Sequence, residues 1–351
     1  MAAAIVAYGG EVDATGGATP TMAQRTAMYQ KVFAGEVLTA FEQGSLMLDK
    51  HNIRTITSGK SATFPNLGRV TSGYHVPGDE LVSQAVTNNE TEILIDGLLY
   101  SAVFIDNVDE MMSHFDFRSP YATEMGRKLA QDFDMSVMLV LMNAALAGAK
   151  LTARGDLAAT SKVQYLGAAY EGGTVAAKAA ALATAIFAQA AIWDNQHVPG
   201  ERYCALIPQD YNVLIQNTAA INSDWGGQGA YADGTIFKVG GVNILKSPTM
   251  SRICNNTGTG INTITHANTL PVGAALTTKA IAEARGMATE HADVQAVMFT
   301  KDAVGTVKLM DISTESAWDI RRQGTLLVAK YAMGHGVLRG DCAAVFKNEA
   351  S

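Results

Sequence analysis

The stretch that decides the fold is residues 53–95, IRTITSGKSATFPNLGRVTSGYHVPGDELVSQAVTNNETEILI. Apolar residues are thinly spread along it, and glycines and prolines stand between them: Gly59, Pro65, Gly68, Gly73, Pro77 and Gly78. This pattern predicts a long β-hairpin, with two extended arms joined by a turn-rich tip. Because a two-stranded hairpin is at best marginally stable in water, it needs a surface to lie on, either its own chain or a neighbouring subunit.

The charged side chains of this hairpin divide between its two arms. Basic residues lie in the first arm and tip and acidic residues in the second: Arg54, Lys60, Arg69, then Asp79, Glu80, Glu90 and Glu92. One interpretation is two solvated faces, since exposed ion pairs contribute little to stability. The other is that these charges pair with charges on adjoining subunits and fix their register. The shortage of self-burial in the hairpin favours the second interpretation.

The segments around the hairpin predict helices and one strand. Residues 1–30 are rich in Ala, Gly and Thr and indicate a mobile or partner-dependent arm. Residues 31–41, KVFAGEVLTAF, have helical spacing, and residues 93–106 resemble a strand. A long helix should begin at Ser119-Pro120 and run to about Gly148, a rod of roughly 40 Å. Its apolar ridge has i, i+4 spacing: Met125, Leu129, Phe133, Val137 and Leu141.

The second half of the chain mixes helices and strands without a repeating βα period. Residues 150–174 and 255–275 indicate loops, residues 175–193 and 208–217 helices, and residues 236–245 a hairpin about Gly240-Gly241. Strands are expected at residues 202–207, 294–300, 304–313 and 325–333. The order predicts an α+β protein and argues against a doubly wound or barrel enzyme.

Composition limits the class of protein and its partners. Of 351 residues, 48% are hydrophobic and only 17% are charged, against a typical charged fraction of about 25%. Such a surface is typical of a protein that hides area against partners, although a large core also dilutes charge. The net charge of −7 predicts weak, non-specific contact with nucleic acid at most.

The cysteines and the apolar runs indicate a place of synthesis. Cys204, Cys254 and Cys342 are far apart and odd in number, which predicts reduced thiols and synthesis in a cytosol. The N-terminal sequence lacks the basic region of a signal peptide. The apolar run at residues 135–149 is shorter than the roughly 20 residues of a membrane span, so no membrane partner is expected.

Motifs that carry chemistry are incomplete. Ser58-Gly59-Lys60-Ser61 ends like a P-loop, but Arg54 stands where the first glycine belongs, which favours a polar hairpin turn. Gly334-His335-Gly336 lacks the third glycine of a dinucleotide loop and predicts a bend or bulge with unusual glycine dihedrals. An acidic cluster more simply forms a solvated connection, with a structural cation left open: Asp106, Asp109, Glu110, His114 and Asp116. We expect no catalytic residue, cofactor or metal site.

Several longer segments carry a family resemblance. KVFAGEVLTAF (31–41), SGKSATFPNLGR (58–69), IDGLL (95–99), AVGTVKL (303–309) and AKYAMGHGVLR (329–339) resemble the major capsid protein of short-tailed bacteriophages of the autographivirus type. The resemblance is good over about residues 30–120 and 290–347, and RYCALIPQDYNVL (202–214) anchors the part between.

The resemblance implies the α+β Johnson fold of phage capsid subunits. Residues 1–50 would be the N-terminal arm, 51–97 the extended E-loop, and 98–150 the peripheral domain with its spine helix. Residues 151–290 would form the axial domain, and 291–351 the strands that return to the peripheral domain.

The resemblance also implies a structural function. Subunits would assemble as hexamers and pentamers into an icosahedral shell around double-stranded DNA, with scaffolding and portal proteins and possible decoration or minor capsid proteins as partners. The chain would be made in the host bacterial cytoplasm and located in the virion. Each hairpin would lie over a neighbouring subunit and bury apolar residues there: Phe64, Leu67, Tyr74 and Val76. The alternatives are an α+β enzyme with a dispersed active site and a ring-forming tail or connector protein.

Overall fold

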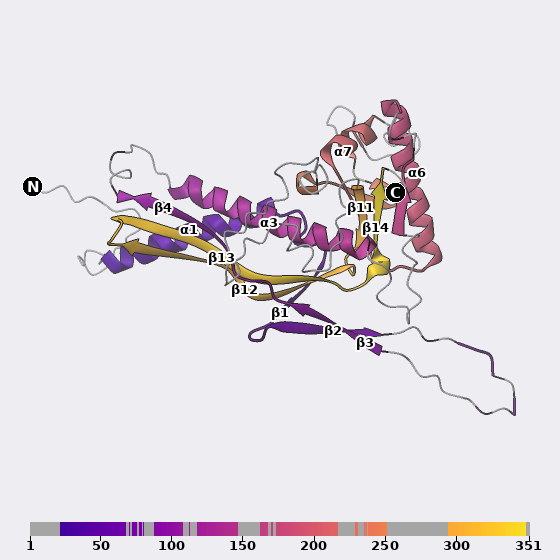
Figure 1. Cartoon of the computed structure of the whole chain (residues 1–351), viewed down its shortest axis with the longest axis horizontal. Helices are drawn as coiled ribbons and strands as arrows, with labels where there is room; N and C mark the ends of the chain where they lie inside the picture. The colour runs from indigo at the N-terminus through magenta and orange to yellow at the C-terminus, as the bar shows by residue number, and fades with distance from the viewer. Residues whose placement is uncertain are drawn as a thin grey trace, which may run out of the picture. The chain divides into compact units, whose positions relative to one another are not determined.

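The computed structural model of the chain (Figure 1) describes residues 22–67, 70, 72–75, 77–78, 80, 88–107, 112, 118–146, 162–167, 170, 173–216, 229–230, 235–236, 238–250 and 294–348. The chain divides into two compact units, each assembled from three separate segments. Unit 1 comprises Met1–Ser45, Leu98–Gln131 and Met310–Ala332, and unit 2 comprises Leu46–Gly97, Asp132–Leu309 and Met333–Ser351.

The first helix of unit 1 is longer than its sequence pattern indicates. Helix α1 spans Met22–Gly44, so it begins well before the helical pattern of residues 31–41. The reason is local propensity: MAQRTAMYQK consists mainly of good helix formers, and neither Gly nor Pro occurs between Pro20 and Gly35. The helix ends at Gly44, just beyond the predicted pattern.

Small residues let α1 approach the N-terminal half of α3 (Arg118–Leu146) closely. A Cβ atom added to Gly126 would lie 2.5 Å from the Val37 carbonyl oxygen and 2.8 Å from the Ala40 Cβ. One added to Gly44 would lie 3.2 Å from the Ala130 Cβ. The two helices of unit 1 therefore pack with almost no side chain between their backbones at Gly126.

The strands of unit 1 bury one face of their sheet and expose the other. β4 (Leu99–Asp106) pairs with β13 (Gly324–Val337) in antiparallel register from Gly324↔Asp106 to Tyr331↔Leu99, and β12 (Val304–Asp319) lies on the other side of β13. On the inner face Ile105, Leu327 and Ala329 are buried, and the Tyr331 ring meets the Phe41 ring of α1 at 6.2 Å. The outer face carries Tyr100, Phe104 and Leu326, each 36–37% exposed.

Unit 2 is built around a six-stranded sheet in the order β5-β14-β11-β6-β10-β9. Its strands are β5 (Val163–Tyr165), β14 (Ala343–Lys347), β11 (Val294–Thr300), β6 (Arg202–Leu206), β10 (Val242–Lys246) and β9 (Lys238–Val239). The central strands β11, β6 and β14 are buried almost throughout, as expected for the middle of a covered sheet. A separate short pair joins β7 (Gly229–Ala230) to β8 (Thr235–Ile236).

Helices α6 (Val175–Asn195) and α7 (Pro208–Ile215) pack against each other in unit 2. Both were predicted from the sequence, and Thr174 caps α6 by accepting a hydrogen bond from the Ala177 amide. The hairpin about Gly240-Gly241 is confirmed, with φ values of 58° and 79° that glycine adopts readily. The strands predicted at residues 202–207 and 294–300 are confirmed, and those at 304–313 and 325–333 are longer than expected.

Among the described residues, two helices are long and apolar enough to cross a membrane by length and composition alone. The apolar window of α3 is 78% buried within the protein, so α3 is a core helix. The window of α6 is 33% buried, through Leu182, Ile186 and Trp193 among others.

Two cysteines of unit 2 lie in its core. Cys204 and Cys342 are free thiols with no exposed surface. Burial raises the pKa of each thiol to about 12. Cys254 and the predicted loop at residues 255–275 lie outside the described residues.

The close helix contact in unit 1 yields a stability prediction. Gly126→Ala should lower the free energy of unfolding by about 1–3 kcal/mol, because the new methyl group meets backbone and Cβ atoms. Gly35→Ala on α1 is the matched control: its Cβ would meet nothing within 4 Å, so it should raise stability by about 0.5–1 kcal/mol. Urea unfolding of both variants checks this, and equal losses in the two would contradict the close packing at Gly126.

Candidate functional site

The predicted hairpin is present, and it begins later than expected. β2 (Ser61–Leu67) pairs with β3 (Asn88–Leu94) in antiparallel register from Ser61↔Leu94 to Leu67↔Asn88, side by side in Figure 1. Residues 52–55 do not belong to the hairpin: they form β1 (Asn52–Thr55), which pairs in parallel with Gly305–Lys308 of β12. β1 thus pairs with the longer strand β12, and the Ile56 amide extends this pairing by donating a hydrogen bond to the Lys308 carbonyl at 2.9 Å.

The strand expected at residues 93–106 is two strands. β3 ends at Leu94 and β4 begins at Leu99. Between them the Asp96 amide donates to the Met333 carbonyl at 3.2 Å, and Gly97 follows. The break falls at Asp96-Gly97, a turn-favouring pair that interrupts the apolar run.

The hairpin is held at its base by a small apolar cluster of its own chain. Ala62, Ile93 and Val307 are buried there, and partly buried residues pack against them: Ile56, Phe64, Ile95 and Leu338. The cluster joins the two hairpin strands to β12 and to the segment after β13. The base of the hairpin therefore has a core, whereas the described residues nearer its tip have none.

Two glycines of β13 allow β3 to pack closely against it. A Cβ on Gly334 would lie 2.1 Å from the Leu94 carbonyl oxygen, and one on Gly336 would lie 2.7 Å from a side-chain carbon of Ile93. The prediction of unusual dihedrals at Gly334-His335-Gly336 is wrong, because neither glycine has positive φ and both lie within a regular strand. Glycine is needed here for close approach, while Gly59, with φ 113°, does form the predicted turn.

The chain enters the hairpin through residues 46–51, named here the anchor segment. The Asp134 carboxylate of α3 accepts hydrogen bonds from the Leu46 amide at 2.8 Å and the Met47 amide at 3.1 Å. The Met47 side chain is fully buried, and so is His51 at the end of the segment. No sequence pattern indicates this contact, since its partners lie 87 and 88 positions apart.

The candidate contact residues fall into three groups. Arg54 and Phe64 contact their own chain: the Arg54 guanidinium donates to the Thr63 carbonyl at 2.7 Å and lies 5.6 Å from the Phe64 ring centre. Arg54 is nevertheless exposed, and the further exposed candidates are Lys60, Tyr74, Glu80, Glu90 and Glu92. The remaining candidates are Leu67, whose backbone alone is described, and Arg69, Val76 and Asp79, which lie outside the described residues.

Several exposed apolar residues were not among the candidates. Val70 is 71% exposed beside the fully exposed Tyr74. Tyr100, Phe104 and Leu326 form a further patch on the outer face of the unit 1 sheet, named here the sheet patch. The sequence LYSAVFID did contain a signal, because β4 is apolar at both odd and even positions, a pattern typical of strands covered on both faces.

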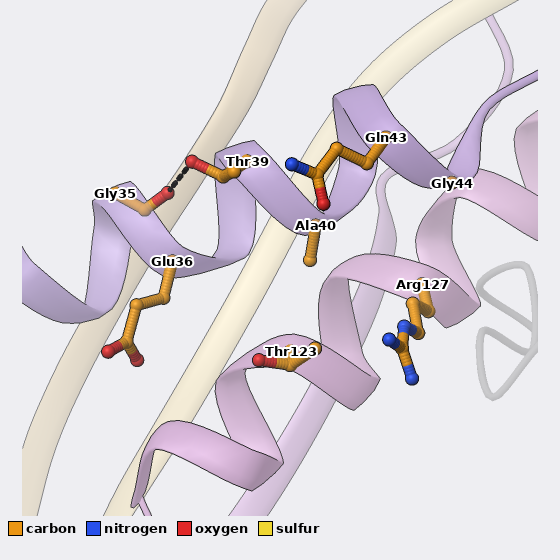
Figure 2. A pocket seen from close by; sticks show the side chains of 8 residues that line it. All are labelled: Gly35, Glu36, Thr39, Ala40, Gln43, Gly44, Thr123 and Arg127. Atoms are coloured by element: carbon orange, nitrogen blue, oxygen red, sulfur yellow. Dashed lines mark hydrogen bonds between the residues drawn. The ribbon is translucent and has the colours of Figure 1, made fainter.

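A groove of about 640 Å³ runs between α1 and α3 of unit 1 (Figure 2). It is lined by Gly35, Glu36, Thr39, Ala40, Gln43, Gly44, Thr123 and Arg127. The Thr39 and Thr123 hydroxyls donate to carbonyls of their own helices, to Gly35 and Ser119. The lining residues include no serine, cysteine or histidine, so the groove offers no nucleophile paired with a base.

No metal site forms in the part of the chain that the structure describes. There, no three His, Cys, Asp or Glu side chains gather as ligands. Of the acidic cluster, Asp106 is described, and Asp109, Glu110, His114 and Asp116 lie outside the described residues.

Solved structures of phage capsids share this fold. The capsid structure of the cyanophage P-SCSP1u is 36% identical, with a TM-score of 0.66 over 86% of this chain and 87% of that chain. The mature capsid of bacteriophage PhiM1, at 18% identity, shares the fold with a TM-score of 0.66 over 88% of each chain. The fold thus defines a phage capsid protein.

The chain belongs to the Gp10A-like major capsid protein family, whose sequence profile matches residues 63–347. The major capsid protein of Escherichia phage T7 is 31% identical over 342 residues, which cover 93% of each chain. The expected family and α+β capsid fold are confirmed. The chain is a structural capsid protein and not an enzyme, and nothing supports the enzyme or connector alternatives.

The glycine seat of the hairpin yields a second prediction. Gly334→Ala should destabilise the protein by about 1–3 kcal/mol, because the added methyl group collides with the Leu94 carbonyl. Gly73→Ala, in the distal hairpin, has open space around its Cβ and should leave the melting temperature within experimental error. Thermal unfolding followed by circular dichroism compares the two, and a stable Gly334→Ala variant would argue against the seat.

Proposed function

We propose that this chain assembles with copies of itself, as hexamers and pentamers, into the icosahedral shell that encloses double-stranded phage DNA, and that its hairpin contacts a neighbouring copy. The observation that carries the hairpin contact is the exposure of Val70 and Tyr74. Both large apolar side chains project from a hairpin whose apolar cluster lies at the other end, at its base. Water around such residues is released when a partner covers them.

The receiving surface in this proposal is the sheet patch of the neighbouring copy. Tyr100, Phe104 and Leu326 offer an apolar area for Tyr74, and burial of one such side chain contributes about 1.5–3 kcal/mol. Opposite charges lie on the two surfaces of this contact. The hairpin carries exposed acids, Glu80, Glu90 and Glu92. The turn just before β13, next to the sheet patch, carries the exposed bases Arg321 and Arg322.

A contact between two different surfaces of the same chain suits a closed ring. Because the hairpin and the sheet patch are different surfaces, each copy would offer both to its two neighbours, and rotation would repeat the contact around the ring. Each contact is modest, so misplaced subunits can dissociate, while the completed shell is stabilised by many contacts at once.

The domain assignment belongs to the same proposal. We assign residues 1–50 to the N-terminal arm, 51–97 to the E-loop, 98–150 to the peripheral domain, 151–290 to the axial domain and 291–351 to the returning strands. The capsid location in the virion follows from the family. A scaffolding protein, a portal protein, minor or decoration proteins and synthesis in a bacterial cytoplasm are further parts of the proposal.

Tyr74→Ser tests the hairpin contact. It should leave unfolding unchanged, since the Tyr74 side chain is fully exposed. It should reduce the yield of closed particles by about tenfold or more, because each subunit contact loses one buried apolar side chain. Tyr165→Ser removes a comparably large exposed side chain from β5 of unit 2 and serves as the control. Electron microscopy and sedimentation measure the yield. Normal particles from Tyr74→Ser would mean that the hairpin tip makes no essential contact.

Charge reversal tests the second part of the proposal. Glu92→Lys and Arg321→Glu should each slow assembly, by like-charge repulsion across the subunit contact. The double variant should assemble faster than either single variant, and added salt should reduce all the differences. Light scattering records the assembly rates. Strictly additive effects of the two reversals would show that these residues do not face each other.

A further inference from the structure

A column of rings in unit 2 joins the anchor segment to the strands that hold the hairpin. The His51 ring lies 5.6 Å from the Phe133 ring of α3, centre to centre, and Phe133 in turn meets the His335 ring of β13 edge-on at 5.3 Å. His335 Nδ1 is 2.9 Å from the Thr306 hydroxyl of β12. Thr306 lies within the segment of β12 that pairs with β1. The column therefore links the anchor segment to β13 and, through Thr306, to β12, the strand that pairs with β1.

His51 has one satisfied ring nitrogen and one unsatisfied one. Nδ1 lies 2.7 Å from the Met47 carbonyl, to which it must donate, because a carbonyl oxygen only accepts. The other nitrogen, Nε2, is therefore the unprotonated acceptor of a neutral ring. It is buried without a hydrogen-bond partner among the described residues, and the whole side chain is only 3% exposed. A second proton would place an N–H donor and a positive charge where nothing accepts them.

The surrounding charges do not compensate such a proton. Lys301, from the turn after β11, opposes a positive charge on His51, and Asp49 of the anchor segment favours it more weakly. On α3, Asp134 already accepts two amides of the anchor segment. Asp302 accepts from the Asn52 side chain, Lys50 donates to the Leu46 carbonyl, and His335 faces Thr306. Burial, as the largest cause, lowers the pKa of His51 below its ordinary value of 6.5.

We propose that His51 keeps the base of the hairpin closed only while its ring is neutral. Uptake of one proton at Nε2 releases the anchor segment from α3 and loosens β1 and the base of the hairpin. The N–H bond that the proton forms with the Nε2 lone pair is the one covalent change, and the only ligand is the proton. The released state exposes His51 to water, where the charged imidazole is solvated. Mild acid thereby frees the hairpin to move while the six-stranded sheet of unit 2 stays folded.

The direction of the pH dependence follows from linkage. Because the closed state holds His51 neutral, the contribution of His51 to closure is complete above pH 6.5 and is lost as the pH falls below it. Between about pH 7.5 and about pH 5.5, the opening equilibrium should therefore rise by up to about tenfold. Carboxylates ordinarily titrate below about pH 5, so histidines are the side chains that change their charge in this window.

Hydrogen exchange of the full-length chain tests the proposal independently of assembly. The reporters are three amides at the hairpin base: Ile56, bonded to Lys308 at 2.9 Å, Ile95, bonded to Lys60 at 2.9 Å, and Asp96, bonded to Met333 at 3.2 Å. Their protection factors, corrected for intrinsic exchange, should fall by about tenfold across the pH window. Amides of β6 and β11 should keep theirs, which separates local opening from global unfolding.

Two variants complete the test. His51→Asn retains a donor near the position of Nδ1 but does not titrate, so the protection at Ile56, Ile95 and Asp96 should become independent of pH. His75→Asn removes an exposed hairpin histidine and should leave the wild-type response intact. An acid response that survives in His51→Asn, or is missing in the wild type, overturns the proposal.

A direct titration covers the case in which His51→Asn does not fold. The ring nitrogens of wild-type His51 can be followed by NMR alongside the same three amides. The proposal requires protonation of Nε2 and loss of protection to share one midpoint. Protonation of a ring that stays in place, with protection unchanged, would overturn it.

Discussion

The uneven burial of the hairpin is the constraint on which the rest of the structure depends. Its apolar contacts with its own chain gather around Ala62, Ile93 and Val307, and beyond Phe64 the described large side chains, Val70 and Tyr74, face water. A free subunit tolerates this exposure because the base is firmly seated on β13 and β12. The same exposure makes the isolated chain incomplete, which suits a capsid protein whose stable form is an assembly.

Close backbone approach recurs where the chain must keep this hairpin in place. Gly334 and Gly336 bring β13 against β3, and Gly126 brings α3 against α1 in unit 1. An added methyl group would collide with backbone atoms at Gly126 and Gly334 and with the Ile93 side chain at Gly336. The ring column at His51 adds a support of another kind, one whose strength depends on a single proton.

The sequence allowed much of this fold to be predicted, because most elements are marked by local signals. Ser119-Pro120 marks the start of α3, Gly240-Gly241 marks a tight turn, and α6 stops before Pro199-Gly200. What escaped prediction depends on partners far away in sequence. β1 leaves the hairpin for β12, Asp134 binds an amide 88 positions away, and Gly334 avoids a clash with a carbonyl that no local pattern indicates. Within the candidate site, the charges and the turn could be predicted, but the packing of Phe64 against the apolar cluster could not, because it requires knowing which face of β2 meets Val307 and Leu338.

The two buried thiols have a consequence for the life of the particle outside a cell. Because burial raises the pKa of Cys204 and Cys342 to about 12, almost none of either thiol is ionised at neutral pH. Thiolate is the form that attacks disulfides and reacts with peroxides. These two thiols therefore remain chemically inert in the aerated water around a virion. Neither one offers a route to accidental cross-linking or oxidative damage during long storage.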